Sequence, residues 1–140
     1  MKTLLWLDDI RDPFANDGEW LVYSPIRRPY EVNWVKSYDE FIAWISEHGL
    51  PDAICFDHDL GLDEVHEKGT MSKRALKRHR KTPDYKTGYD CAKWLIDYCL
   101  DNGKTLPAYA IQSANPVGRD NINGLLQGFA RHQGRQSMQP

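Results

Sequence analysis

The sequence KTLLWLDD at residues 2–9 decides the fold, because it joins a short apolar run to a pair of acids. Leu4–Leu7 is apolar throughout, a pattern typical of a strand that is buried on both faces. The same order returns at residues 53–59, AICFDHD, where another apolar run stops at acids. Both runs are therefore predicted to be strands that end at aspartates.

Strand and helix patterns alternate along the rest of the chain. We expect strands at residues 2–7, 30–35, 53–56 and 106–111, and helices at residues 37–49, 87–102 and about 115–132. Residues 8–29 hold three prolines and an Asn-Asp-Gly turn signal, so they are predicted to be mostly loop. The alternation implies βαβ crossovers and an α/β fold, a parallel sheet of about four strands with helices on both faces.

Capping residues and apolar stripes support the predicted helices. Ser37 and Thr87 are N-cap residues, each with an acid three positions later, and Gly49 and Gly103 end the two helices. Apolar residues recur at helical spacing in all of them. The stripes consist of Phe41, Ile42, Trp44 and Ile45; of Cys91, Ala92, Leu95, Ile96 and Cys99; and of Ile122, Leu125, Leu126 and Phe129.

Length and composition exclude several protein classes. A chain of 140 residues and 16.2 kDa fits one core, and we expect a single domain at residues 1–134 with a frayed tail at 135–140. No window approaches 18 consecutive apolar residues, which argues against a membrane protein. Cys55, Cys91 and Cys99 form no disulfide framework or zinc-type spacing, which favours a reducing cytoplasm. Nothing in the pattern indicates a homo-oligomer.

The net charge of −2 hides a strong segregation of charge. Residues 68–86 carry eight Lys or Arg and one acid, a net charge of +7, which leaves −9 on the other 121 residues. This basic run lies in a predicted insertion at residues 62–86, after the third strand. It either steers phosphates or RNA toward a site or is a solvated surface insertion.

The carboxyl ends of parallel strands gather functional residues at one edge of a sheet. Asp8 and Asp9 follow the first strand, where two adjacent carboxylates repel unless a cation neutralises them. A divalent ion such as Mg²⁺ meets that need. The alternative is a helix or loop cap, or an ion pair with Arg11 in the same turn, and local spacing does not choose between these interpretations.

Asp57-His58-Asp59 follows the third strand and should meet the first acid pair. If the strand continues, Asp57 and Asp59 share a face and His58 points the other way. Asp57 then joins a metal site or attacks phosphorus as a nucleophile, and His58 serves as a general acid or base. The alternative is a solvated turn.

Gln112-Ser113-Ala114-Asn115 follows the fourth strand and precedes a helix at Pro116. Asn115 or Ser113 is a candidate N-cap, and the helix N-terminus is a natural place for a phosphate. Arg119 stands near the first turn, where a cation opposes the helix dipole unless an anion is nearby.

Four motifs in this order resemble the cyclic-phosphate processing receiver domain, a bacterial and phage family of receiver-like proteins. The resemblance runs from Leu7 to about Phe129, and its motifs are LDDIRDP (7–13), FDHDLG (56–61), TGYDCAKWL (87–95) and SANPVGRDNI (113–122). It implies a flavodoxin-type, receiver-like sheet. It also implies a Mg²⁺ or Mn²⁺ site at Asp8, Asp9 and Asp57, with Ser113 at the Ser/Thr position of receivers.

This chain departs from signalling receivers and from its own family pattern. His58 stands beside the would-be phosphoacceptor, and we find no fifth strand and no lysine after one. The family pattern has a His matching His58 and usually a second His before the Ser, where this chain has Gln112. Gln transfers no proton, so a paired-His mechanism does not carry over directly.

The resemblance implies a phosphoesterase that acts on cyclic phosphates, at an RNA terminus (2′,3′-cyclic) or in a cyclic nucleotide. We expect a hydrolase with three groups of site residues. They are catalytic His58, Asp57 and Ser113; substrate-binding Arg11, Gln112, Asn115 and Arg119; and metal-binding Asp8, Asp9 and Asp57. The alternatives are a non-catalytic binder of a phosphorylated ligand and a degenerate receiver that docks a partner protein.

Overall fold

A computed structural model describes residues 1–60, 86–112 and 115–137 of the chain. Its centre is a parallel sheet in the order β2-β1-β3-β4. The strands are β1 (Lys2–Leu7), β2 (Tyr30–Val35), β3 (Ala53–Phe56) and β4 (Ala108–Ile111). The predicted bounds of the first three strands are confirmed, and so is the four-stranded parallel α/β sheet.

The two central strands are buried on both faces, as the apolar runs predict. Leu5 and Leu7 of β1 contribute to one core, and Leu4 and Trp6 contribute to a core on the opposite face. All four are fully buried. The sheet is therefore the middle layer of the domain.

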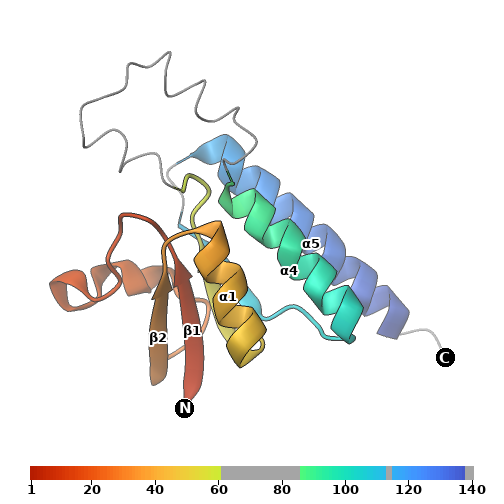
Figure 1. Ribbon diagram of the computed structural model, residues 1–140, viewed down its shortest axis with the longest axis horizontal. Coiled ribbons are helices and arrows are strands. Elements are labelled where there is room, and N and C mark those ends of the chain that lie inside the picture. The colour runs from red at the N-terminus through yellow and green to blue at the C-terminus, as the bar shows by residue number, and fades with distance from the viewer. Residues whose placement is uncertain (61–85, 113–114, 138–140) are drawn as a thin grey trace.

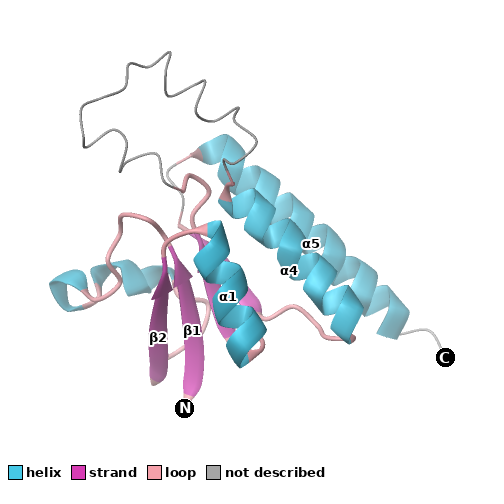
Figure 2. Cartoon of the chain, viewed as in Figure 1, coloured by secondary structure: helices cyan, strands magenta, loops and turns pink. Residues whose placement is uncertain are grey.

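The α-helices of the described residues gather on one face (Figures 1 and 2). They are α1 (Tyr38–His48), α4 (Gly88–Asn102) and α5 (Pro116–Ser137), and α4 and α5 lie side by side. From β2 to β3 and from β3 to β4 the chain moves across the sheet in the same direction. Because crossovers between parallel strands are right-handed, both connections place their helices on the same face.

The opposite face is covered by short 3₁₀ helices. The connection from β1 to β2 runs in the other direction across the sheet, so the same handedness places it on the other side. It forms η1 (Ala15–Asp17) and η2 (Glu19–Tyr23), and Trp20 and Leu21 pack on the second core. A segment predicted to be mostly loop therefore supplies the helical cover of this face.

The predicted caps are present, whereas β4 and α5 differ from their predicted bounds. Ser37 Oγ accepts from the Glu40 N–H at 3.1 Å, and Thr87 and Asp90 form a reciprocal capping box. Strand β4 begins two residues late, because the N–H of Leu106 bonds to Gln133 instead and Pro107 has no N–H.

Helix α5 continues to Ser137, past its predicted end at about residue 132. Gln133 also donates to the Lys104 carbonyl at 2.8 Å, so this part of the helix is tied to the loop before β4. Residues 135–137 of the tail that was expected to fray are therefore helical. Residues 138–140 lie outside the described part of the chain.

Nearly all of the predicted basic insertion also lies outside the described residues. Lys86 is its one described member, and the Lys86 ammonium lies 5.7 Å from the centre of the Tyr38 ring. Within the described part of the chain, no helix has the length and apolar character needed to cross a membrane.

Candidate functional site

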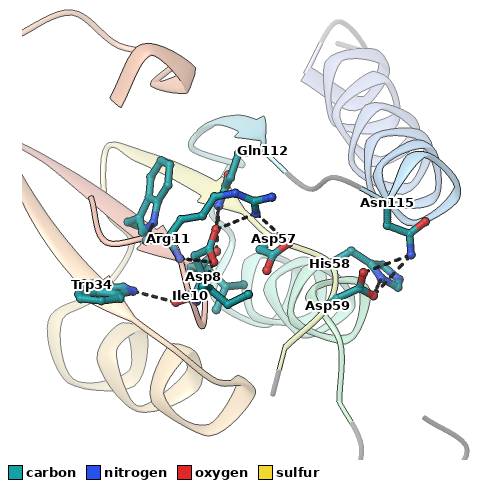
Figure 3. Close-up of polar contacts among 11 residues, drawn as sticks. Asp8, Ile10, Arg11, Trp34, Asp57, His58, Asp59, Gln112 and Asn115 are labelled. Atoms are coloured by element: carbon teal, nitrogen blue, oxygen red, sulfur yellow. Dashed lines mark hydrogen bonds and ion pairs between the residues drawn. The ribbon is translucent and has the colours of Figure 1, made fainter. Parts of the chain in front are cut away.

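The site lies where the strand order reverses, between β1 and β3. The chain leaves β1 toward β2 and then returns to β3 on the other side, and parallel α/β sheets bind their ligands at the carboxyl ends of strands at such a reversal. Leu7 pairs with Phe56, so Asp8 and Asp57 come next on adjacent strands, and the Asp57 N–H bonds to the Leu7 carbonyl at 2.9 Å. The predicted convergence of strand-end residues is thus present (Figure 3).

Three carboxylates form a cluster at these strand ends. Asp8, Asp9 and Asp57 each offer an oxygen, and these oxygens lie within 4.8 Å of one another. Asp8 is fully buried and Asp57 is 4% exposed. Burial, followed by the charges of Asp8 and Asp9, raises the pKa of Asp57 to about 8. Burial among these acids therefore favours the protonated form of Asp57.

Arg11 pairs with this cluster. Its Nη1 lies 3.2 Å from an Asp8 oxygen and 3.8 Å from an Asp57 oxygen, and its guanidinium lies 5.1 Å over the Trp20 ring. The ion pair between Arg11 and the acids, which the sequence analysis gave as an alternative to a metal, is therefore present. It lowers the pKa of Asp57, but burial and the acidic neighbours outweigh it.

The donor set suits a hard divalent cation. Mg²⁺ and Mn²⁺ prefer carboxylate oxygens, and the three aspartates offer them from two neighbouring loops. Arg11 pairs with two of the three carboxylates, and the pKa of Asp57 stays raised, first by burial and then by the charges of Asp8 and Asp9. These residues fit a divalent cation, and Arg11 is the protein cation beside it.

Three tryptophans support the loop from Asp8 to Arg11, and the sequence analysis did not single them out. Trp34 Nε1 donates to the Asp8 carbonyl at 2.7 Å, and Trp6 Nε1 donates to the Arg11 carbonyl at 2.8 Å. Trp6 and Trp34 are register partners in β1 and β2, and Trp20 reaches the loop from η2. A buried indole N–H needs an acceptor, but only the strand register shows which carbonyl supplies it.

Gln112 holds the end of β1 and Asp8 in place. Its Nε2 donates to the Leu7 carbonyl at 3.0 Å and lies 3.5 Å from an Asp8 oxygen. The side chain is 4% exposed, and its Oε1 has no hydrogen-bond partner among the described residues. Gln112 is therefore part of the framework of the acid cluster.

His58 belongs to a second group beside the acids, at the start of α5 (Figure 3). Its Nδ1 lies 2.9 Å from an Asp59 oxygen, and the Asn115 amide lies 3.4 and 3.5 Å from the two Asp59 oxygens. Strand β3 ends at Phe56, so the alternation expected for Asp57 and Asp59 does not apply. Asp57 faces Arg11, whereas Asp59 faces His58 and Asn115.

Two glycines permit the close approach of α4 and α5 to this segment. A Cβ on Gly88 would lie 1.8 Å from the Asp57 carbonyl oxygen, and the Gly88 N–H bonds to the His58 carbonyl at 2.8 Å. A Cβ on Gly118 would lie 2.3 Å from Cγ of the His58 ring. Both positions thus require glycine for the packing that holds Asp57 and His58, which sequence analysis did not identify.

Asn115 and Arg119, two further predicted site residues, stand at the N-terminus of α5. Asn115 Oδ1 accepts from the Gly118 N–H at 3.0 Å, which is the predicted N-cap contact. Arg119 is exposed, and its backbone N–H donates to the Asn115 carbonyl at 2.9 Å. Ser113 lies outside the described residues.

Comparison with known proteins agrees with this geometry. The model of the cyclic-phosphate processing receiver domain matches residues 3–128 of the 140. No curated protein and no solved structure matches the chain significantly. The family match spans the four strands, the acid cluster and the His58 group, and the chain therefore belongs to the cyclic-phosphate processing receiver domain family.

Proposed function

We propose that this protein hydrolyses a cyclic phosphate with the help of a divalent cation. One observation supports this proposal most directly. The three-residue segment after β3 supplies Asp57 to a buried acid cluster and His58 to a hydrogen-bonded His-Asp pair beside it. A cation site and a proton-transfer group therefore stand next to each other, and the name of the family agrees with a cyclic-phosphate substrate.

The reaction adds one water across one P–O ester bond of the cyclic phosphate. The water oxygen bonds to phosphorus and loses a proton, while the ring oxygen leaves phosphorus and gains one. The product is a phosphomonoester with a free hydroxyl. His58 transfers the proton at one of these two oxygens, and solvent water serves the other.

The other site residues bind the substrate in this proposal. Arg11 is partly exposed and its guanidinium lies beside the acid cluster, so it contacts an oxygen of the bound phosphate. Asn115 and Arg119 contact the phosphate at the N-terminus of α5, where the positive end of the helix dipole favours an anion. Ser113 lies outside the described residues and is a further phosphate contact expected from the sequence. Asp8, Asp9 and Asp57 would hold Mg²⁺ or Mn²⁺, which when bound neutralises charge on the phosphate.

The test measures turnover by the wild type and by histidine variants with Mn²⁺ or Mg²⁺ present. The substrates are a 2′,3′-cyclic nucleotide and an RNA with a 2′,3′-cyclic phosphate end. His58→Ala is expected to lower kcat by at least about a hundredfold. His48→Ala is the matched control, because His48 is exposed and ends α1 at the opposite edge of the sheet. Equal turnover by the wild type and His58→Ala would remove His58 from the mechanism.

A second candidate is a protein that binds a cyclic phosphate without hydrolysing it. Gln112 favours it, because its amide is engaged with Leu7 and Asp8 and transfers no proton. Calorimetry that detects binding of a cyclic nucleotide, together with no product after long incubation, would select this candidate.

A further inference from the structure

The Asp59 carboxylate lies between two side chains from different parts of the chain. One oxygen is 2.9 Å from His58 Nδ1, and both oxygens are within 3.5 Å of the Asn115 amide nitrogen. Residues 58 and 59 follow β3, whereas Asn115 stands immediately before α5. The contact is thus made by tertiary structure between elements more than fifty residues apart in the sequence.

An ionised carboxylate accepts hydrogen bonds and donates none. The ring nitrogen that faces Asp59 therefore carries the proton, and in a neutral imidazole the other nitrogen carries the lone pair. This geometry makes Nδ1 the donor to Asp59 and leaves Nε2 as the atom that exchanges a proton with a substrate or water.

Contacts on both sides keep the ring in this orientation. Asn115 donates to Asp59 through Nδ2 and accepts from the Gly118 N–H through Oδ1, so Asp59 is tied to the first turn of α5. The His58 ring packs on Gly118, where a Cβ would collide with it. The His58 side chain is 18% exposed, which leaves part of the ring accessible.

We propose that Asp59 is a positioning residue that holds His58 in the Nδ1–H tautomer, so that Nε2 is the proton-transferring atom. The catalytic part of this inference rests on the proposed function, whereas the tautomer is a property of the folded protein. Carboxylates that orient a histidine in this way set both its tautomer and the direction of its ring.

Nuclear magnetic resonance on ¹⁵N-histidine-labelled protein tests the tautomer, because two-bond ¹H–¹⁵N correlations distinguish a proton on Nδ1 from a proton on Nε2. The wild type is expected to show the proton of His58 on Nδ1. In Asp59→Asn the amide nitrogen donates to the ring, and the Nε2–H form is expected to dominate. Asp101→Asn removes an exposed acid near the far end of α4 and should leave the His58 signals unchanged.

Kinetics adds a second readout in the same three proteins. Asp59→Asn is expected to lower kcat about ten- to a hundredfold while KM changes less than about twofold, because substrate contacts remain. A wild-type His58 protonated on Nε2 would overturn the inference whether or not turnover is detected. Unchanged tautomer and kcat in Asp59→Asn would also overturn it. Absence of turnover in a wild type with the Nδ1–H form would instead count against the proposed function alone.

Discussion

Asp57 stands in two opposing electrostatic environments. Burial and the neighbouring carboxylates of Asp8 and Asp9 raise its pKa to about 8, whereas the Arg11 guanidinium at 3.8 Å lowers it. A folded-state pKa above the usual value of 3.8 means that the ionised form of Asp57 is unfavourable in the metal-free protein. A bound cation would offset the free-energy cost of ionising this buried carboxyl group.

The first prediction concerns the stability of Asp57→Asn. Between pH 4 and pH 8 the folded protein keeps a proton on Asp57 that the unfolded chain has lost, so this group makes the free energy of unfolding fall as pH rises. Asp57→Asn is expected to raise the free energy of unfolding of the metal-free protein by about 1–2 kcal/mol at pH 8. At pH 4 it should change little. Urea denaturation at both values of pH measures the difference.

The control for this prediction is Asp101→Asn, which removes an exposed acid outside the site. Its effect should stay within about 0.5 kcal/mol at both values of pH. A gain in Asp57→Asn that is equal at pH 4 and pH 8 would contradict an electrostatic origin.

At the scale of elements, the N-terminal turns of α4 and α5 shape the site. Gly88 brings the start of α4 against the backbone of Asp57, and Gly118 brings the start of α5 against the His58 ring. Thr87 and Asn115 cap these two helices, so their first turns are held at the residues that make the contacts. The helix ends thus act as supports for the segment after β3.

The second prediction uses the glycines of α5 as a matched pair. Gly118→Ala places a Cβ inside the His58 ring and is expected to displace it, which lowers kcat at least about tenfold. Gly124→Ala adds a Cβ that meets nothing within 4 Å and should raise the free energy of unfolding by up to about 1 kcal/mol. Steady-state kinetics and thermal unfolding of both variants measure these effects. Full activity in Gly118→Ala would show that the ring position does not matter.

Local sequence signals predict most of the elements because short-range physics governs them. The apolar runs of β1 and β3 and the caps Ser37 and Thr87 act within a few residues, and their predicted positions are confirmed. The start of β4 and the end of α5 are wrong for a shared reason, since Gln133 bonds to the loop at residues 104–106. That contact joins residues 27 and 29 positions apart, beyond the reach of a periodicity argument.

At the scale of the whole molecule, the sheet order brings the acids together. The reversal between β1 and β3 places Asp8 and Asp57 side by side although 49 positions separate them in the sequence. The same reversal sends the first connection to the opposite face, where Trp20 supports Arg11. The topology thus both assembles the acid cluster and places Trp20 against Arg11.

The third prediction is that Mg²⁺ or Mn²⁺ stabilises the folded protein through the acid cluster. A ligand that binds only the folded state at about a hundred times its Kd adds about 2.7 kcal/mol to the free energy of unfolding. Asp8→Asn, which keeps the size of a fully buried side chain, is expected to remove most of this gain. Tm measured with and without each ion tests it, and Asp101→Asn should respond as the wild type does. If the ion raised the Tm of Asp8→Asn as much as that of the wild type, the ion would bind at another site.

The fourth prediction concerns the segregated charge, which the sequence shows directly. Residues 68–86 carry +7, so reversal of charge at Lys77, Arg78 and Arg80 is expected to weaken binding of a phosphate-rich ligand such as a short RNA. The loss should shrink as salt is raised, since salt screens long-range attraction. Binding titrations at two salt concentrations measure this. If charge reversal left RNA binding unchanged and binding did not depend on salt, the segment would have no role in attracting the ligand.

The sequence by itself determined the parallel α/β class, the order of elements and the chemistry of the strand ends, because apolar runs, caps and acids are local features. It also named Asp8, Asp57 and His58 as neighbours through the strand-end rule. Only the tertiary structure decided that Arg11 pairs with two of the acids, that Asp59 turns to His58 and that Trp34 supports Asp8. Those contacts depend on strand register, on the handedness of the crossovers and on the close approach at Gly88 and Gly118, and each of these arises only when distant segments pack together.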